Sequence, residues 1–273
     1  DRSETESNYI PRTLSSIDGA GNPIKISEDE LLDASLPIVV LGEPGMGKTR
    51  LLSGLGRHGK DVNYVRAASF IRHPKKYDTT GNPLVIDALD EVASLLPGDP
   101  LHIVLTALAE LNFPDFIVSC RSADWRHISG KADIAEDYRR LPTVWRIEPI
   151  SEAESRDYLI RAGVDSDVAD SLIERLGLHN LSELLGNPLT LQMLASIVDA
   201  SIDYLPETRA ELFERAIDVL WREENDAHEN SRLARMSKAE ALNGAGAICA
   251  SLLLTGTSAV VRSQGSLSNG TIL

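Results

Sequence analysis

The sequence contains few cysteines, few aromatic residues and no long apolar run, and each shortage excludes a class of protein. Two cysteines among 273 residues, Cys120 and Cys249, are too few for a disulfide framework, and no paired Cys or His spacing indicates a zinc site. The most apolar stretch, residues 245–261, is diluted by Gly, Ser and Thr. It is shorter than the roughly 20 residues that a membrane span needs, so we expect a buried helix there. These features predict a cytoplasmic protein with no membrane partner.

Basic residues are also scarce. Lys and Arg number 27 against 41 Asp and Glu, which gives a formal net charge of −14. Proteins that bind nucleic acids or anionic membranes mainly through charge need a basic face, so we do not expect a nucleic acid as a partner of this chain. A short basic run, residues 72–76, is interpreted as a solvated loop. Apolar residues make up 42% of the chain, which is enough for a sizeable core.

Short apolar runs alternate with helical segments between residues 36 and 150, and this alternation predicts a parallel α/β sheet flanked by helices. The expected strands are residues 36–41, 62–70, 84–86, 116–119 and 144–150, with helices at 50–57 and 101–111. Residues 1–35 are polar and rich in turn residues, and we expect a lead segment there with one short helix at 26–32.

After residue 150 the strand pattern stops and amphipathic, capped segments follow. The expected helices are residues 151–162, 167–176, 181–185, 189–200, 208–224 and 238–254. We therefore predict a nucleotide-binding domain over 36–150, an all-α helical domain over 151–204 and a further region over 205–273.

The strongest single signal is the octapeptide GEPGMGKT at residues 42–49, between the first expected strand and a helix. It matches GxxxxGK[ST] in the required strand–loop–helix context. Its glycines let the backbone wrap around a phosphate, while successive N–H groups and the helix N-terminus supply positive charge. Lys48 then neutralises the β- and γ-phosphates, and Thr49 ligates Mg²⁺. The predicted cofactors are ATP or ADP with Mg²⁺, and the residues expected to bind the nucleotide here are Gly42, Glu43, Pro44, Gly45, Met46, Gly47, Lys48, Thr49 and Arg50.

A second signal is LVIDALDE at residues 84–91. A carboxylate at the end of a buried strand is costly unless it has a cation or strong donors. Beside a phosphate loop, Asp87 is therefore predicted to be the outer-shell magnesium partner. Asp90 and Glu91 follow on the turn, where one of them could orient or activate the attacking water. The alternative is that this pair caps a helix and compensates its dipole, and the sequence does not separate the two residues.

One expected strand, 62–70, intervenes between the phosphate loop and Asp87, which indicates the additional-strand class of P-loop NTPases. In that class the fourth strand lies next to the first. Arg121 would then end a strand beside the phosphate loop and sense the γ-phosphate, unless it forms only a surface salt bridge. Cys120 is interpreted as a packing residue, because no His or Lys follows nearby to lower its pKa. Arg139 and Arg140 are interpreted as a solvated helix end rather than an arginine finger.

These residues resemble a known family, the NACHT ATPases within the STAND class of P-loop NTPases. The diagnostic element is a small residue, Ala88, after the magnesium Asp, followed by the acidic pair. Four further segments carry the resemblance, namely VSCR at 118–121, the GxP-like GNPLTL at 186–191, a winged-helix entry at 205–213 and YIPR at 9–12. By this resemblance Pro188 packs on the adenine and Ile10 approaches the base, while residues 205–273 begin a winged-helix domain. His228 is then the candidate for the phosphate-contacting His of that domain.

The resemblance implies an ATP/ADP-dependent molecular switch with slow ATP hydrolysis. STAND proteins hold ADP when closed, exchange it for ATP when a sensor is engaged, and then oligomerise to activate an effector. The implied role is bacterial antiphage-type defence or regulation, with the trigger and the effector carried outside this chain. The alternative is an AAA+-like remodelling or nucleic-acid-loading ATPase. A GTPase is disfavoured because the sequence has no NKxD motif.

Overall fold

The computed structural model divides the chain into two compact units. One is built on residues 11–148, and the other on residues 149–263 together with Tyr9 and Ile10. The residues that the structure describes are 9–58, 61–77, 81–94, 96, 98–127, 130–200, 208, 210–218, 237–255, 259–261 and 270–272.

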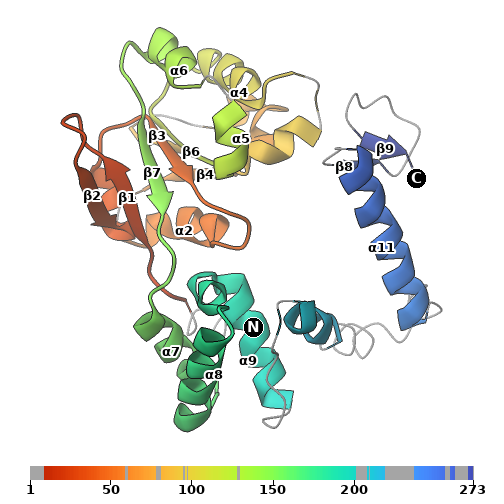
Figure 1. Ribbon diagram of the computed structural model, residues 1–273. Helices are drawn as coiled ribbons and strands as arrows, with labels where there is room; N and C mark the ends of the chain where they lie inside the picture. Colours follow the sequence, from red (N-terminus) through yellow and green to blue (C-terminus); the bar gives the residue numbers. More distant parts are fainter. Residues whose placement is uncertain are drawn as a thin grey trace. The chain divides into compact units, whose positions relative to one another are not determined.

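The first unit contains a seven-stranded sheet in the order β2-β1-β7-β3-β6-β5-β4 (Figure 1). Five of its strands are parallel: β3 (Ile38–Leu41), β4 (Asn63–Arg66), β5 (Leu84–Asp87), β6 (Phe116–Cys120) and β7 (Thr143–Ile147). The fourth of these, β6, pairs with the first, β3, so that Val39 lies opposite Val118. This is the α/β sheet of an additional-strand P-loop NTPase, as the sequence predicts.

The sheet is mixed rather than wholly parallel, because residues 13–27 add a β-hairpin to it. The strands β1 (Thr13–Ile17) and β2 (Pro23–Ser27) pair antiparallel, and β1 also pairs antiparallel with β7. The prediction of a polar lead segment without strands was therefore wrong. Leu14 is buried, and half of the residues in these two strands are polar, among them Ser16, whose hydroxyl donates to the carbonyl of Val144 at 2.7 Å.

Several expected elements differ in their bounds from the structure. The strand expected over 36–41 begins at Ile38, and the strand expected over 144–150 runs from Thr143 to Ile147. The strand expected over 62–70 ends at Arg66, and the chain then turns into α3 (Ala67–Phe70), whose two end residues are buried. The helix expected at 26–32 begins only at η1 (Glu28–Asp33), because Ile26 belongs to β2 and pairs with Leu14.

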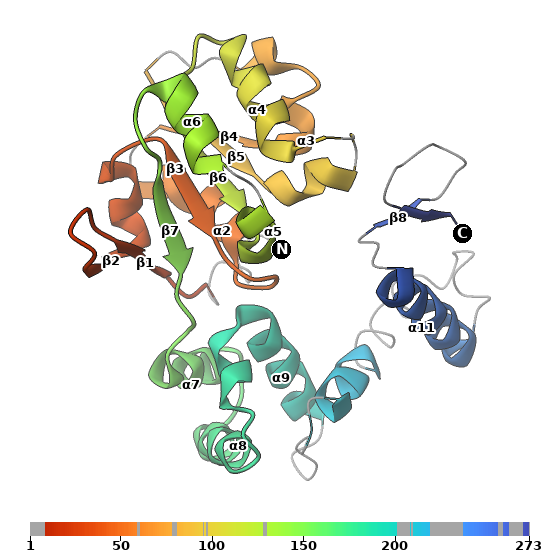
Figure 2. The same ribbon diagram turned by 45° about the horizontal axis from the view of Figure 1, so that its top comes forward.

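Each face of the sheet is covered by its own helical layer. Side chains at odd positions of β3, Val39 and Leu41, join the core formed with α3, α4 (Pro100–Ala109) and α6 (Gly130–Tyr138). Ile38 and Val40 face the opposite side and pack with α2 (Lys48–Gly54) and η1. The helices α4 and α6 therefore lie on one face of the sheet and α2 on the other (Figure 2). A strand buried on both faces explains why this segment is apolar at every position.

The second unit is helical over residues 152–200. It consists of α7 (Glu152–Arg161), α8 (Ser166–Leu178), η5 (Ser182–Gly186) and α9 (Pro188–Ala200), and its core is formed largely by leucines. Ser151 and Glu154 form a capping box at the start of α7, which satisfies the first backbone N–H groups of that helix. Residues 210–218 are also helical, and Leu212 and Ala216 belong to the same core.

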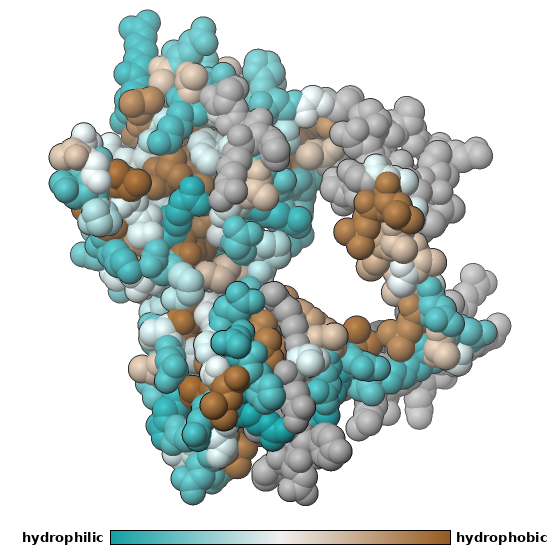
Figure 3. Space-filling view, viewed as in Figure 1, coloured by the Kyte–Doolittle hydropathy of each residue, from teal (hydrophilic) through white to brown (hydrophobic). Residues whose placement is uncertain are grey.

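The expectation of a buried helix over 245–261 was wrong. The helix α11 (Lys238–Thr255) has no buried residue, and β8 (Ala259–Val261) pairs with β9 (Gly270–Ile272) beyond it. Leu253 and Leu254 are 83% and 88% exposed. Figure 3 shows a brown, hydrophobic surface at one end of α11. Alanines and glycines make up much of this helix, and they bury little area.

Some predictions concern residues outside those that the structure describes. His228 and the domain boundary at 204–205 are among them, so the winged-helix region stays a prediction. Within the described residues, no helix combines the length and apolar character needed to cross a lipid bilayer.

The glycine of the GNPLTL segment occupies a position where a side chain would clash. A Cβ atom at Gly186 would lie 2.9 Å from Cβ of Pro149, which belongs to the same unit. We predict that Gly186→Ala destabilises the helical unit by about 1–3 kcal/mol, the range of overpacked sites, in a denaturant titration.

Gly177→Ala is the matched control, because the nearest atom to its Cβ would be Oγ of Ser182 at an ordinary 3.7 Å. Gly177 lies in the last turn of α8, where alanine is also tolerated, at most about 0.5–1 kcal/mol better than glycine. Equal stability of the two variants would contradict the proposed clash.

Candidate nucleotide-binding site

The phosphate loop leaves the buried end of β3 and enters α2 at Lys48. Gly45 and Gly47 have φ angles of 82° and 84°, a left-handed conformation that favours glycine. The N–H of Gly42 donates to the carbonyl of Cys120 at 3.3 Å, which ties the loop to the end of β6. This loop presents its backbone ahead of a helix N-terminus, the arrangement that binds an anion.

Lys48 lies back over this loop. Its Nζ donates to the carbonyls of Gly42 at 2.7 Å and Glu43 at 3.2 Å. Burial lowers the pKa of Lys48, the carboxylate of Asp90 opposes that shift, and the nearby Arg121 adds to it. A phosphate oxygen in the loop would compete with the two carbonyls for the ammonium group.

Asp87 ends β5 and is almost fully buried, with 1% of its surface exposed. Three hydroxyls donate to its carboxylate: Thr49 Oγ1 at 2.7 Å, Tyr64 OH at 2.9 Å and Ser119 Oγ at 2.6 Å. Each bond offsets part of the cost of burying the charge.

Thr49 and Asp87 also fit the magnesium ion that the loop implies. Their hydroxyl and carboxylate oxygens meet at the start of α2, and oxygen donors of this kind are the ligands that Mg²⁺ prefers. The structure thus brings together the two residues predicted from the sequence as metal ligands.

Tyr64 and Ser119 were missed by the sequence reading. Ser119 donates to Asp87 and accepts the N–H of Ala88 at 2.9 Å. That second bond supports Ala88 in a left-handed backbone conformation, with φ of 61°, which is unusual for a residue with a side chain. The sequence does place the hydroxyl of Ser119 near the end of an expected strand. Only the pairing of β5 with β6, however, shows that this hydroxyl lies beside Asp87.

The acidic pair is divided between two environments. Oδ2 of Asp90 lies 2.7 Å from Nε of Arg121, and the Asp90 side chain is 10% exposed against 51% for Arg121. Glu91 is exposed. The geometry therefore brings Asp90, not Glu91, to Arg121 and into the electrostatic surroundings of Lys48.

Other predicted residues lie as follows. Cys120 is fully buried in the sheet core, consistent with a packing role. Arg140 forms an ion pair with Asp115, at a position where an exposed pair adds little stability. Arg50 is an exposed residue of α2.

The two residues predicted to contact the base belong to the helical unit. Ile10 is buried in its leucine-rich core, and Pro188 is the first residue of α9. Their contact with an adenine stays a prediction.

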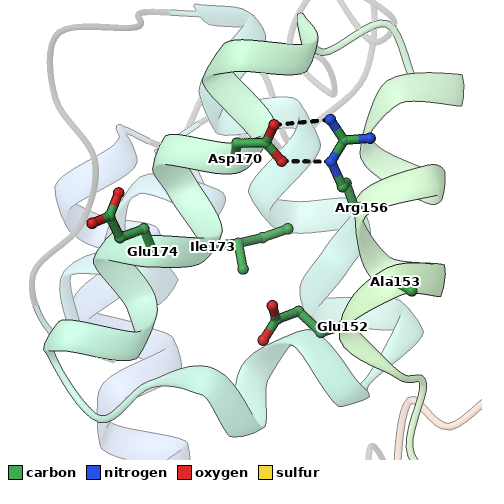
Figure 4. Close-up of a pocket in the computed structure, with 6 residues that line it drawn as sticks. All are labelled: Glu152, Ala153, Arg156, Asp170, Ile173 and Glu174. Carbon is green, nitrogen blue, oxygen red and sulfur yellow. Dashed lines mark hydrogen bonds and ion pairs between the residues drawn. The ribbon is translucent and has the colours of Figure 1, made fainter.

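A separate surface pocket of about 420 Å³ lies between α7 and α8 (Figure 4). Arg156 spans it and donates to Asp170, with 2.8 Å between Nη2 and Oδ2. Glu152 and Glu174 also line it, so three carboxylates face one guanidinium, which is already paired with Asp170, and the lining does not suit a phosphate. No group of three or more metal-ligating side chains occurs in the part of the chain that the structure describes. The phosphate loop therefore remains the candidate site.

No protein-family model and no curated protein matches the sequence. Solved structures do match. AMPPCP-bound DnaA from Aquifex aeolicus is 16% identical, with 75% of this chain and 76% of that chain covered, at a TM-score of 0.34. A RuvB variant from Thermotoga maritima is 15% identical, with 70% and 64% covered, at a TM-score of 0.41.

A Walker-type ATPase from Pyrococcus abyssi is 11% identical, with 71% of both chains covered, at a TM-score of 0.41. Likenesses at these scores carry no argument about activity. The assignment of a P-loop NTPase fold rests on the chain's own phosphate loop and strand order.

The hydrogen bond from the Tyr64 hydroxyl to the carboxylate of Asp87 is predicted to stabilise the fold. Tyr64→Phe removes one donor from a buried carboxylate and should lower the free energy of unfolding by about 1–3 kcal/mol in the absence of nucleotide. Tyr77→Phe is the matched control, because the ring of Tyr77 packs on Phe70 at 6.0 Å between centroids and keeps that contact. If Tyr64→Phe lowered the free energy of unfolding no more than Tyr77→Phe does, the result would contradict the proposed hydrogen bond.

The two cysteines are predicted to differ sharply in reactivity. Burial raises the pKa of Cys120 to about 12, so its thiolate is scarce at pH 8, whereas Cys249 is exposed. Brief treatment of the native protein with iodoacetamide at pH 8 should therefore alkylate Cys249 alone, as read by peptide mass spectrometry. Both cysteines should react after denaturation. Alkylation of native Cys120 at a comparable rate would show that β6 is not buried as described.

Proposed function

We propose that this chain is an ATP/ADP-dependent molecular switch of the NACHT type, within the STAND class, that hydrolyses ATP slowly to reset itself. The observation that carries the proposal is the meeting of four charged groups at one edge of the sheet. Lys48, Asp87, Asp90 and Arg121 come from four different segments, and Lys48 lies within electrostatic reach of the other three.

In this proposal each of these residues contacts a different part of the bound nucleotide. The amides of the phosphate loop and Lys48 bind the β- and γ-phosphates. Thr49 and Asp87 would hold Mg²⁺, which would neutralise phosphate charge when bound. Asp90 or Glu91 orients the attacking water, and Arg121 senses the γ-phosphate.

A switch needs two arrangements that bind ATP and ADP differently. In this proposal the nucleotide-binding unit provides the phosphate contacts, while Pro188 and Ile10 of the helical unit provide the base contacts. Exchange of ADP for ATP then alters the arrangement of the units and leads to self-association. The trigger and effector segments, and a role in cytoplasmic antiphage defence, belong to the proposal by family resemblance.

The test is to purify the protein, denature it and identify any released nucleotide by chromatography. The proposal predicts close to one ADP per chain from the wild type and little or none from Lys48→Ala. Lys75→Ala is the matched control, because that side chain is 77% exposed in the basic run and its loss should leave the ADP content unchanged.

Nucleotide-free protein that turns over ATP many times per minute would contradict the switch. That outcome would favour the alternative, an AAA+-like remodelling or nucleic-acid-loading ATPase.

A further inference from the structure

The ion pair between Asp90 and Arg121 links the ends of two neighbouring strands. Asp90 lies in η4 (Leu89–Ser94), which follows β5, and Arg121 is the first residue after β6. Nε of Arg121 is 2.7 Å from Oδ2 of Asp90. Because β6 pairs with β3 as well as with β5, this ion pair lies at the edge of the sheet from which the phosphate loop emerges.

The two partners differ in their exposure. The Asp90 side chain is only 10% exposed, whereas that of Arg121 is 51% exposed. A carboxylate that is nine-tenths buried is costly to leave without a cation, while an exposed guanidinium is readily solvated. The pair is therefore asymmetric: Asp90 depends on Arg121 more than Arg121 depends on Asp90.

Both partners act on the phosphate-binding lysine. Burial lowers the pKa of Lys48 most strongly, Asp90 opposes that shift, and Arg121 adds to it. A phosphate bound in this loop would thus lie within electrostatic reach of both members of the ion pair. A diphosphate can occupy the loop while Arg121 stays paired with Asp90. A third phosphate adds negative charge that competes with Asp90 for the same guanidinium.

We propose that Asp90 sets the preference of the site for ADP over ATP by holding Arg121 away from the γ-phosphate. This inference rests on the proposed function, because it needs Arg121 to contact a γ-phosphate. When Arg121 moves to the triphosphate, it breaks its bond to Asp90 and leaves a buried carboxylate without that partner. ATP binding carries this cost, and ADP binding does not. Asp90 is in this sense a specificity-determining residue.

The test compares the affinities of ADP and of a β,γ-methylene ATP analogue, which is not hydrolysed, by displacement of a fluorescent nucleotide. Asp90→Asn keeps the shape of the side chain and removes its charge. The ratio of the ADP dissociation constant to that of the analogue should rise roughly tenfold, the size expected for one charge-assisted hydrogen bond. Asp90→Ser should give the same shift if the amide packs poorly, with thermal melting as the check on folding.

Two controls separate this effect from a general loss of negative charge. Asp124→Asn removes one charge from a carboxylate that, like Asp90, lies within electrostatic reach of Cys120, and it should change the ratio by less than about twofold. In an Arg121→Ala background, Asp90→Asn should change the ratio no more than Asp124→Asn does, because the effect passes through Arg121.

The outcomes are distinguishable. Equal shifts from Asp90→Asn and Asp124→Asn, or a shift that persists without Arg121, would overturn the inference while leaving nucleotide binding intact. Failure of the wild type to bind either nucleotide would overturn the proposed function and the inference together.

Discussion

The buried carboxylate of Asp87 constrains the whole edge of the sheet at which the phosphate loop lies. A charge with 1% exposure needs several donors, and the chain supplies them from α2, β4 and β6 through the hydroxyls of Thr49, Tyr64 and Ser119. These bonds fix where the ends of neighbouring strands lie relative to the first turn of α2. The same oxygens are those that suit Mg²⁺, so the group that organises the fold locally is also the group expected to hold the metal.

Strand order determines which other side chains reach this point. Because β6 lies between β3 and β5, the residues at its end meet the phosphate loop on one side and the acidic turn on the other. The carbonyl of Cys120 accepts the N–H of Gly42, and Arg121 pairs with Asp90. A different order would separate these groups, even with the same residues in the same elements. The site is therefore a consequence of topology as much as of motif.

The parts of the fold that local patterns determine could be predicted from the sequence. The phosphate loop, the magnesium carboxylate Asp87 and the strand order each follow from a run of residues or a count of strands. The hairpin at residues 13–27 could not be predicted, because its hydroxyl-rich strands are stabilised by pairing with β7, far away in the sequence. The roles of Tyr64 and Ser119 could not be predicted for the same reason. Both hydroxyls donate to Asp87, which belongs to another strand.

Asp87, held by its three hydroxyls, is expected to make nucleotide binding at this site depend on Mg²⁺. The most direct measurement is the affinity for ADP by calorimetry, with Mg²⁺ and with EDTA, for the wild type and for Asp87→Asn. The account predicts that Mg²⁺ tightens ADP binding to the wild type about 10–100-fold, and that Asp87→Asn removes most of this gain without abolishing binding in EDTA. An ADP affinity that Mg²⁺ leaves unchanged in the wild type, or an equal gain in the variant, would contradict it.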